Sequence, residues 1–338
     1  MLSDRAKLRR DFIARSGWGH AKEALLAGDA SFRKYFRLFA PDGSSSIVMD
    51  APPPQEDVRP FIRIDRHLRA LGFSAPEILA EDVEHGFLLL EDLGDDTFAR
   101  LMDRRQPPPG GDEASLYALA TDVLVALHGF GARALLPGLE AYAGEALIDA
   151  AMLLPEWYLP AVEARPAREA ELESYRTAWR EVLAAMPPAP DTLLLRDFHK
   201  DNLMWLPQRQ GVGACGLLDF QDALRGHAAY DLMSLIEDAR RDIDPALRAA
   251  MLDRYAVHAG VADRAAFDTA FAILGAQRHA RVIGLFVRLL RRDGKPDYLP
   301  HLPRVWRLFE RSLAHEALTP LRRWVDGHVP PAKRGSAL

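Results

Sequence analysis

Three residues near the middle of the chain have the side chains and the spacing that a metal-assisted reaction needs. Asp197 is followed five positions later by Asn202, inside a strand-like, polar and again strand-like stretch at residues 193–205. A second apolar run, at residues 216–218, ends at Asp219. An aspartate can accept the proton of a hydroxyl group, and carboxylate and amide oxygens suit Mg²⁺. We therefore expect Asp197 to be a catalytic base, and Asn202 and Asp219 to bind the metal.

Phosphoryl transfer from ATP is a reaction that such groups serve. The site must orient a hydroxyl group, hold Mg²⁺ on the nucleotide phosphates and neutralise the charge that develops. An alternative is structural, because Asp and Asn at this spacing are common in turns, where both side chains bond to nearby backbone. The second acid, Asp219, at the end of another apolar run, favours the catalytic interpretation.

The segments that carry these residues resemble a known family. Residues 195–202, 217–222 and 229–233 resemble the aminoglycoside-phosphotransferase-like kinases of small molecules. That resemblance implies an α+β, two-lobed protein-kinase-like fold, with a small β-rich N-terminal lobe and a larger, mainly helical C-terminal lobe. It also implies ATP and Mg²⁺ as cofactors.

Three further segments resemble one branch of this family. Residues 28–37, 48–57 and 277–284 are similar to the kinases that phosphorylate N-acetylmuramate and N-acetylglucosamine at the anomeric hydroxyl. The resemblance covers nearly the whole chain. It implies a small amino-sugar substrate and a role in peptidoglycan recycling.

The order of apolar patterns divides the chain into the expected lobes. We expect a nucleotide-binding lobe with leading helices at residues 1–93, a catalytic and substrate lobe at 94–329, and a disordered tail at 330–338, which is rich in Pro, Lys, Arg, Gly and Ser. In the first lobe the patterns predict helix over residues 1 to about 27, a hairpin over 31–50, a helix over 58–71, and strands at 78–82 and 86–93.

Helical periodicity dominates the second predicted lobe. The expected helices span residues 113–129, 147–162 with an interruption at Pro155, 170–186, 230–238, 245–259, 265–292 with a break at Gly275 or Gly284, and 302–324. No repeat, Walker loop, dinucleotide fingerprint or Cys/His metal motif occurs in the sequence.

The connection between the lobes is expected near residues 88–94. The resemblance implies that backbone groups near Glu91, Asp92 and Leu93 hold the adenine. An alternative is that the two acids cap a helix beginning near Asp95.

The sequence departs from the family where a lysine usually meets the phosphates, because Met49 stands there. No lysine occurs between Lys34 and Lys200, so we expect the cation to come from the preceding strand. Arg33 or Lys34 is preferred over Arg37. Alternatively, these basic residues form a solvated face that discourages edge pairing. The hairpin also lacks the usual glycines at residues 29–32.

A second departure is Leu195, where the family usually has a histidine two residues before the catalytic acid. Its loss puts the support of the loop in doubt, and Arg196 is a candidate to replace part of that support. Met49 and Leu195 together suggest a rival interpretation, a non-catalytic nucleotide-binding module. The three retained groups at residues 197, 202 and 219 argue against that rival.

Substrate residues are expected around the acidic edge and on the helical lobe. Asp222, three residues after Asp219, could accept hydrogen bonds from sugar hydroxyls or help to bind the metal, and Glu156 with Trp157 offers a carboxylate and an aromatic face for a sugar ring. Alternatively, Trp157 is part of a core aromatic pair at a helix bend.

Residues 276–296 carry six basic side chains against one acid. A pocket for a polycationic aminoglycoside should instead be acidic. Arg278 or Arg281 would suit a neutral or anionic sugar, and a guanidinium would match the lactyl carboxylate of N-acetylmuramate. The alternative is a basic outer helix face. A kinase of the aminoglycoside or choline type remains a rival function.

Composition limits the other possibilities. Lys and Arg number 43 against 48 Asp and Glu, a net charge of −5, so no basic field suggests nucleic acid or an anionic membrane as a partner. The single cysteine, Cys215, is expected to be a buried small hydrophobe. No signal-peptide or membrane-spanning pattern is present, so we expect a cytoplasmic protein.

Overall fold

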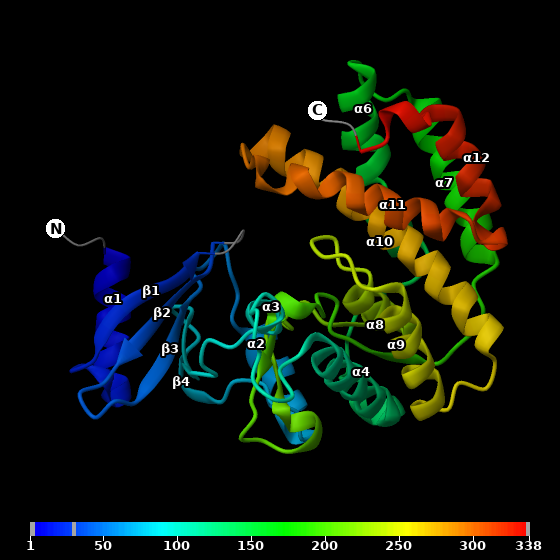
Figure 1. The fold of residues 1–338 in the computed structure, drawn as a ribbon. Coiled ribbons are helices and arrows are strands. Elements are labelled where there is room, and N and C mark those ends of the chain that lie inside the picture. The colour runs from blue at the N-terminus through cyan, green and yellow to red at the C-terminus, as the bar shows by residue number, and fades with distance from the viewer. Residues whose placement is uncertain (1–3, 29–31, 336–338) are drawn as a thin grey trace. The chain divides into compact units, whose positions relative to one another are not determined.

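The computed structural model of the chain describes residues 4–28 and 32–335. The chain divides into two compact units, Met1–Leu119 with Lys200–Ala223, and Ala120–His199 with Leu224–Leu338 (Figure 1). The first unit contains a small antiparallel sheet and the second is mainly helical, which confirms the expected α+β class. The division differs from the expected boundary at residue 93, because residues 94–119 and 200–223 pack with the first unit.

The first unit is built on a five-stranded antiparallel sheet. Its strands, in the order β1-β2-β3-β5-β4, are β1 (Lys22–Gly28), β2 (Lys34–Phe39), β3 (Ser45–Asp50), β5 (Phe87–Glu91) and β4 (Ile78–Asp82). The expected hairpin is β2 and β3, in which Tyr35 pairs with Met49. The turn between them includes Gly43 at φ +88°, a conformation that glycine adopts without a steric penalty.

The two faces of this sheet have different neighbours. On one face Phe36, Val48 and Leu89 join a core with Phe12 and Ile13 of α1 (Asp4–Ile13). Because side chains alternate along a strand, the neighbouring residues of the same strands point to the opposite face, and several of them line a cavity described below.

The predicted leading helix is correct only for its first half. Helix α1 is followed by a π-helical turn, Ala14–Trp18, and Gly17 at φ +85° ends the helical path. Residues 22–28 form β1 instead of helix, paired antiparallel with β2. Leu25 and Leu26 are 64% and 44% exposed. A short apolar run is compatible with either structure, and pairing with β2 decides between them.

The remaining elements of the first unit surround the predicted metal-binding residues. They are helices α2 (Arg59–Ala70) and α3 (Phe98–Met102), 3₁₀ turns Lys200–Asn202 and Gly211–Ala214, and strands β7 (Leu203–Trp205) and β8 (Cys215–Leu217). Strands β7 and β8 pair antiparallel, with Leu203 opposite Leu217. Cys215 is buried, as expected. Helix α4 (Glu113–Gly129) continues from the first unit into the second along the chain.

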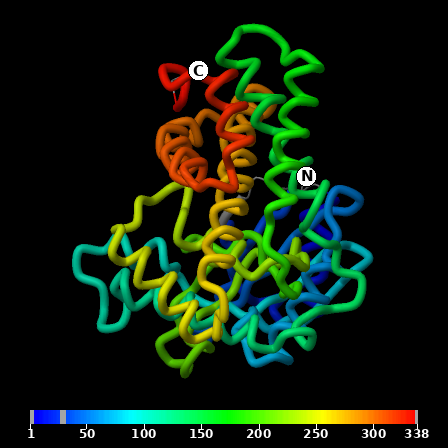
Figure 2. The backbone as a smooth tube through the Cα atoms, turned by 90° about the vertical axis from the view of Figure 1, so that its right-hand side faces the viewer, coloured from blue at the N-terminus to red at the C-terminus, as the bar shows by residue number. Residues whose placement is uncertain are grey.

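The second unit is organised around helix α10, which both views show as one continuous helix (Figure 2). Its core includes Trp179, Ile283, Trp306 and Val325. The elements are helices α5 (Glu145–Ala151), α6 (Leu159–Glu163), α7 (Glu169–Ala184), α8 (Ala229–Ile236), α9 (Pro245–His258), α10 (Arg264–Asp293), α11 (Leu302–Leu313) and α12 (Thr319–His328), the π-helical turn Leu154–Tyr158, strands β6 (Asp191–Leu194) and β9 (Leu224–His227), and 3₁₀ turns Gly131–Ala134, Pro296–His301, Glu316–Leu318 and Pro331–Lys333.

Helix α10 has no break at either glycine, which corrects the expectation. A Cβ at Gly284 would lie 2.1 Å from the carbonyl atoms of Leu153, and one at Gly275 would lie 2.9 Å from the Ser312 hydroxyl oxygen. Both glycines therefore permit close packing against neighbouring segments. The expected helix over 302–324 is instead α11 and α12, and Pro320 in the first turn of α12 suits a helix start.

The expected disordered tail is corrected for residues 330–335. The Lys333 ammonium pairs with Glu163 at 2.6 Å, and the Arg334 guanidinium pairs with Glu310 and Asp326. These ion pairs attach the segment to the second unit, and residues 336–338 lie outside the described part of the chain. Among the described residues, no helix has the length and apolar character needed to cross a membrane.

Candidate active site

Asp231 holds the start of the loop that carries Asp197. Its carboxylate accepts hydrogen bonds from the backbone N–H groups of Leu195 at 2.6 Å and Arg196 at 2.9 Å. Burial raises the pKa of Asp231 to about 7, although these two N–H donors act to lower it. Arg196 has φ +69°, a region that non-glycine residues rarely adopt. The backbone just before Asp197 is thus fixed in an uncommon conformation.

This contact answers the question raised by Leu195. The Leu195 side chain is 3% exposed and packs in the interior, while its backbone N–H is held by Asp231. Arg196 also takes part in this support, through its backbone N–H, which donates to Asp231. The sequence interpretation missed the role of Asp231, although an acid inside the apolar run of α8 must be buried and therefore needs hydrogen-bond donors.

Asp197 has a strongly cationic neighbourhood in the second unit. Burial raises the pKa of its carboxyl group, but Arg278 and Arg281, followed by His199 and Arg196, lower it, and the net result is a pKa below the ordinary value. Asp197 is therefore ionised at neutral pH. An ionised, positioned carboxylate can accept a hydroxyl proton.

The two arginines come from successive turns of α10. Arg278 is 7% exposed, and of the neighbouring charges its own contributes most to lowering the pKa of Asp197. The Nη1 atom of Arg281 is buried and has no hydrogen-bond partner among the same residues. A basic outer helix face is therefore excluded for this pair. A buried Arg278 side chain and an unpartnered Nη1 atom on Arg281 are groups that an anion could bind.

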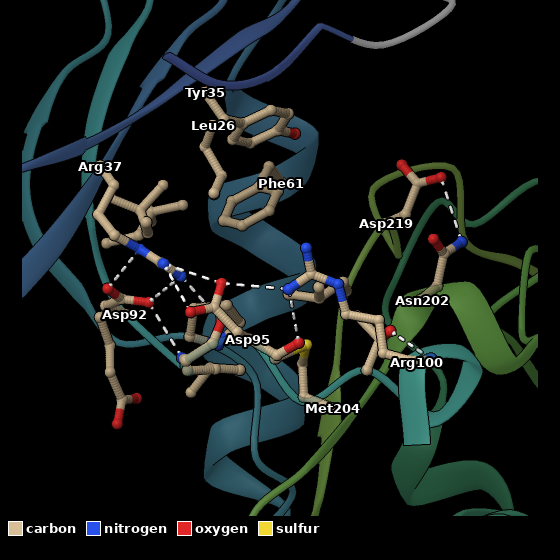
Figure 3. A pocket seen from close by; sticks show the side chains of 18 residues that line it. Leu26, Tyr35, Arg37, Phe61, Asp92, Asp95, Arg100, Asn202, Met204 and Asp219 are labelled. Carbon is tan, nitrogen blue, oxygen red and sulfur yellow. Dashed lines mark hydrogen bonds and ion pairs between the residues drawn. The ribbon is translucent and has the colours of Figure 1, made fainter. Parts of the chain in front are cut away.

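A cavity of about 480 Å³ lies within the first unit (Figure 3). Tyr35, Phe61 and Met204 contribute apolar or aromatic surface, and Asn202 and Asp219 stand at one side of the view. The end of β5 and the residues that follow it, 90–95, line the cavity as well. Its composition, mostly apolar with a few polar groups, is that of a small-molecule site.

Arg37 clamps the segment expected to hold adenine. Its guanidinium pairs with Asp92 at 2.8 Å and Asp95 at 2.9 Å, and donates to the Gly94 carbonyl at 2.9 Å. The Asp92 side chain is thereby committed, while the backbone of Leu93 makes no hydrogen bond with any described residue.

The capping alternative for the two acids is wrong. Helix α3 begins at Phe98, and the Thr97 hydroxyl accepts a hydrogen bond from the Arg100 N–H at 3.1 Å as its cap. Glu91 instead pairs with Arg209.

Asn202 and Asp219 lie together because β7 and β8 pair. Asn202 Nδ2 donates to Asp219 Oδ2 at 3.4 Å, and Gln221 Nε2 donates to Asp219 Oδ1 at 2.7 Å. Asp219 has φ +58°, a left-handed conformation that is uncommon outside glycine. A carboxylate and an amide oxygen at one edge are a donor set that fits Mg²⁺.

The structure distinguishes the two preferred phosphate cations. Arg33 precedes Tyr35 and Arg37 on one face of the β2 segment, the face that lines the cavity. Its Nη1 atom lies 4.0 Å from Asp219 Oδ1. Lys34 has the opposite parity and is exposed, so the geometry favours Arg33. Met49 is fully buried. The expected glycine-poor turn at residues 29–31 lies outside the described residues.

The remaining predicted substrate residues are less closely connected to these centres. Asp222 is exposed and interacts electrostatically with Arg33. Glu156 lies on the π-helical turn 154–158, where burial raises its pKa and Arg176 opposes the rise. Trp157 is partly buried against the main core of the second unit, in agreement with the core alternative. Asn202 and Asp219 thus contact each other in the first unit. Asp197 lies in the second unit, close enough to Arg278 and Arg281 for their charges to lower its pKa.

Several known proteins are similar to this chain in sequence. An N-acetylmuramate/N-acetylglucosamine kinase of Caulobacter vibrioides is 36% identical over 99% of both chains. A protein of the same name from Pseudomonas aeruginosa is 39% identical and covers 90% of this chain and 88% of its own. A third, from Neisseria meningitidis serogroup B, is 35% identical over 88% of this chain and 87% of its own.

Solved structures show a similar fold at low sequence identity. A choline/ethanolamine kinase family protein from Mesorhizobium loti has a TM-score of 0.63 at 16% identity, covering 95% of this chain and 99% of its own. The amicoumacin kinase hAmiN, in complex with AMP-PNP, Ca²⁺ and Ami, has a TM-score of 0.63 at 13% identity, covering 94% and 96%. These likenesses confirm the expected two-lobed kinase-like fold.

A family model, described as the phosphotransferase enzyme family, matches residues 23–268. This match covers most of the chain and includes Asp197, Asn202 and Asp219, while Arg278 and Arg281 lie beyond its end. The chain belongs to the phosphotransferase enzyme family.

Proposed function

We propose that this protein is an ATP- and Mg²⁺-dependent kinase that phosphorylates the anomeric hydroxyl of N-acetylmuramate, N-acetylglucosamine or both, in peptidoglycan recycling. The observation that carries the proposal is the position of Asp197, on a loop whose backbone Asp231 holds, where the charges of Arg278 and Arg281 lower the pKa of its carboxyl group. The names of relatives that align over nearly the whole chain support the choice of substrate.

In this proposal Asp197 accepts the proton of the attacking hydroxyl group. Asp231 acts through the backbone of Leu195 and Arg196 and keeps Asp197 in position. Such positioning matters because phosphoryl transfer depends on geometry and charge stabilisation more than on covalent chemistry by the protein.

The nucleotide is assigned to the cavity of the first unit. Backbone groups near Glu91, Asp92 and Leu93 would hold the adenine, with the Arg37 clamp fixing that segment. Asn202 and Asp219 would bind Mg²⁺, which neutralises phosphate charge when bound. Arg33 would contact the phosphates, on the evidence of its approach to Asp219.

The charge around Asp197 favours an amino sugar over a polycationic antibiotic. Arg278 and Arg281 would repel an aminoglycoside, whereas a guanidinium group can bind the carboxylate of N-acetylmuramate through two hydrogen bonds. Asp222, Glu156 and Trp157 remain candidates for contacts to the sugar hydroxyls and ring.

A direct test mixes the protein with ATP, Mg²⁺ and each amino sugar, and follows the reaction by phosphorus NMR. We expect a new anomeric phosphate signal and a matching amount of ADP. A panel containing aminoglycosides and choline serves as the comparison. ADP release with a member of that panel, but with neither amino sugar, would overturn the substrate assignment.

A further inference from the structure

Glu56, a residue just before α2, contacts Arg33 and the strand that carries it. Its Oε1 atom accepts a hydrogen bond from the Phe32 backbone N–H at 3.1 Å, and its Oε2 atom lies 3.3 Å from Arg33 Nε. The side chains of Arg33 and Glu56 are only 12% and 16% exposed. One carboxylate thus fixes both the backbone and the guanidinium at the start of β2.

The orientation of the guanidinium follows from this pair. The Nε edge of Arg33 faces Glu56, while Nη1 is directed to Asp219 at 4.0 Å, a longer and weaker contact. Burial lowers the pKa of Arg33, but Tyr35, Glu56, Asp219 and Asp222 raise it above the ordinary value. The group therefore stays charged, with its Nη atoms next to the predicted metal-binding acid.

We propose that Glu56 is a positioning residue for nucleotide phosphate, holding Arg33 so that its Nη atoms face the triphosphate. The inference rests on the proposed function, in which Arg33 contacts the phosphates. A long flexible side chain loses conformational freedom when it binds a ligand, and holding it beforehand reduces that cost. A guanidinium anchored through Nε still has Nη donors that match phosphate oxygens.

The buried Met49 explains why such a pair is needed in this chain. Met49 is opposite Tyr35 and carries no charge. Arg33, immediately before β2, approaches Asp219 to 4.0 Å, whereas Arg37 is engaged with Asp92 and Asp95. Glu56 holds this cation at the segment that leads into β2, through its contacts with the Phe32 N–H and with Arg33 Nε.

The decisive variant is Glu56→Gln in the full-length protein. Glutamine keeps an oxygen to accept the Phe32 N–H but removes the charge that holds Arg33. We expect the Kd for ATP, measured by titration calorimetry with Mg²⁺, to rise roughly 10-fold, in line with the loss of a partly buried ion pair. The KM for the sugar should stay unchanged. Asp57→Asn is the matched control, because Asp57 pairs with the exposed Arg59.

A double-mutant cycle tests whether Glu56 acts through Arg33. If it does, Glu56→Gln adds little to the Kd change already caused by Arg33→Gln. Fully additive changes, or an unchanged Kd in Glu56→Gln with a normal melting temperature, would overturn the inference. Calorimetry needs no turnover, so a wild-type protein that binds ATP but phosphorylates neither sugar would defeat the proposed function and leave this test intact.

Discussion

The arginines of the two units differ in whether they form ion pairs with acidic side chains. In the first unit Arg37, which lines the cavity, is paired with Asp92 and Asp95, and Arg33, just before β2, is paired with Glu56. In the second unit Arg278 and the Nη1 atom of Arg281 have no ion-paired acid among the described residues, although Asp197 is in their field. Paired cations are held in place before a ligand arrives, whereas unpaired buried cations are satisfied only by a ligand. This difference predicts that nucleotide binding depends on preorganisation and that acceptor choice depends on charge.

The largest effect is expected from Asp197→Asn, which removes the base and leaves its cations. We expect kcat to fall by roughly 10²–10⁴-fold, the usual contribution of a positioned proton acceptor. ATP affinity should be retained, since the nucleotide contacts belong to the first unit. Coupled ADP-release kinetics and calorimetry measure the two quantities, and full turnover by the variant would contradict the assignment.

Arg281→Gln tests the unpaired cations. We expect kcat/KM for N-acetylmuramate to fall about 10–100-fold, as for a lost charge-assisted hydrogen bond. N-Acetylglucosamine lacks the carboxylate, so its kcat/KM should change much less. The matched control is Arg291→Gln, an exposed arginine on the same helix. Equal losses for both sugars would instead assign Arg281 to the transferred phosphoryl group.

Arg37→Gln tests the paired cations. Loss of its contacts to Asp92, Asp95 and the Gly94 carbonyl should loosen the adenine segment and raise the KM for ATP by roughly 3–10-fold. The KM for the sugar should not change. Arg59→Gln removes an exposed pair of the same unit and should have almost no effect. If the KM for the sugar changed and the KM for ATP did not, the proposal that Arg37 supports nucleotide binding would be wrong.

The first unit also contains a buried acid that is not paired, Asp65 on α2. Its carboxylate oxygens have no hydrogen-bond partner among the described residues. Burial raises its pKa to about 7, above the value of about 3.9 for an exposed aspartate. The folded state therefore retains this proton between those values, and stability falls as the pH rises from about 4 to about 7.

Removing that charge should consequently stabilise the protein at alkaline pH. We expect Asp65→Asn to raise the free energy of unfolding by about 1–3 kcal/mol at pH 8 and by less at pH 5. Urea unfolding at the two pH values measures the difference. Asp231, whose pKa is also raised to about 7, retains its own pH dependence in this variant. Equal stability of variant and wild type at both pH values would show that Asp65 has a partner in solution.

The parts of the site that follow from local sequence were predictable. Apolar runs that end in acids placed Asn202 and Asp219 at neighbouring strand ends, and the spacing of Asp197 identified its loop. The helices with clear periodicity, such as α4 and α9, were also found at their expected places. Helical periodicity depends on neighbours within a few residues, and β7 and β8 are close to each other in the chain.

Features that depend on distant residues could not be predicted in the same way. β1 is a strand because β2 pairs with it, and α10 continues through Gly284 because Leu153 packs against that position. Glu56 carries no sequence signal of its contact with Arg33, which depends on how the chain returns to the start of β2. Asp231 did offer a signal, an acid among apolar residues, but the partner of that acid is 36 positions away.

Gly284 joins the two elements that carry most of the predicted acceptor contacts in the second unit. A Cβ there would meet the backbone of Leu153, so α10, with Arg278 and Arg281, is fixed against the segment that leads into Glu156 and Trp157. These side chains therefore share one rigid support. Relatives that accept other substrates are expected to differ by exchanging side chains on this support, and a designed library that varies those four positions while keeping Gly284 should retain folded members.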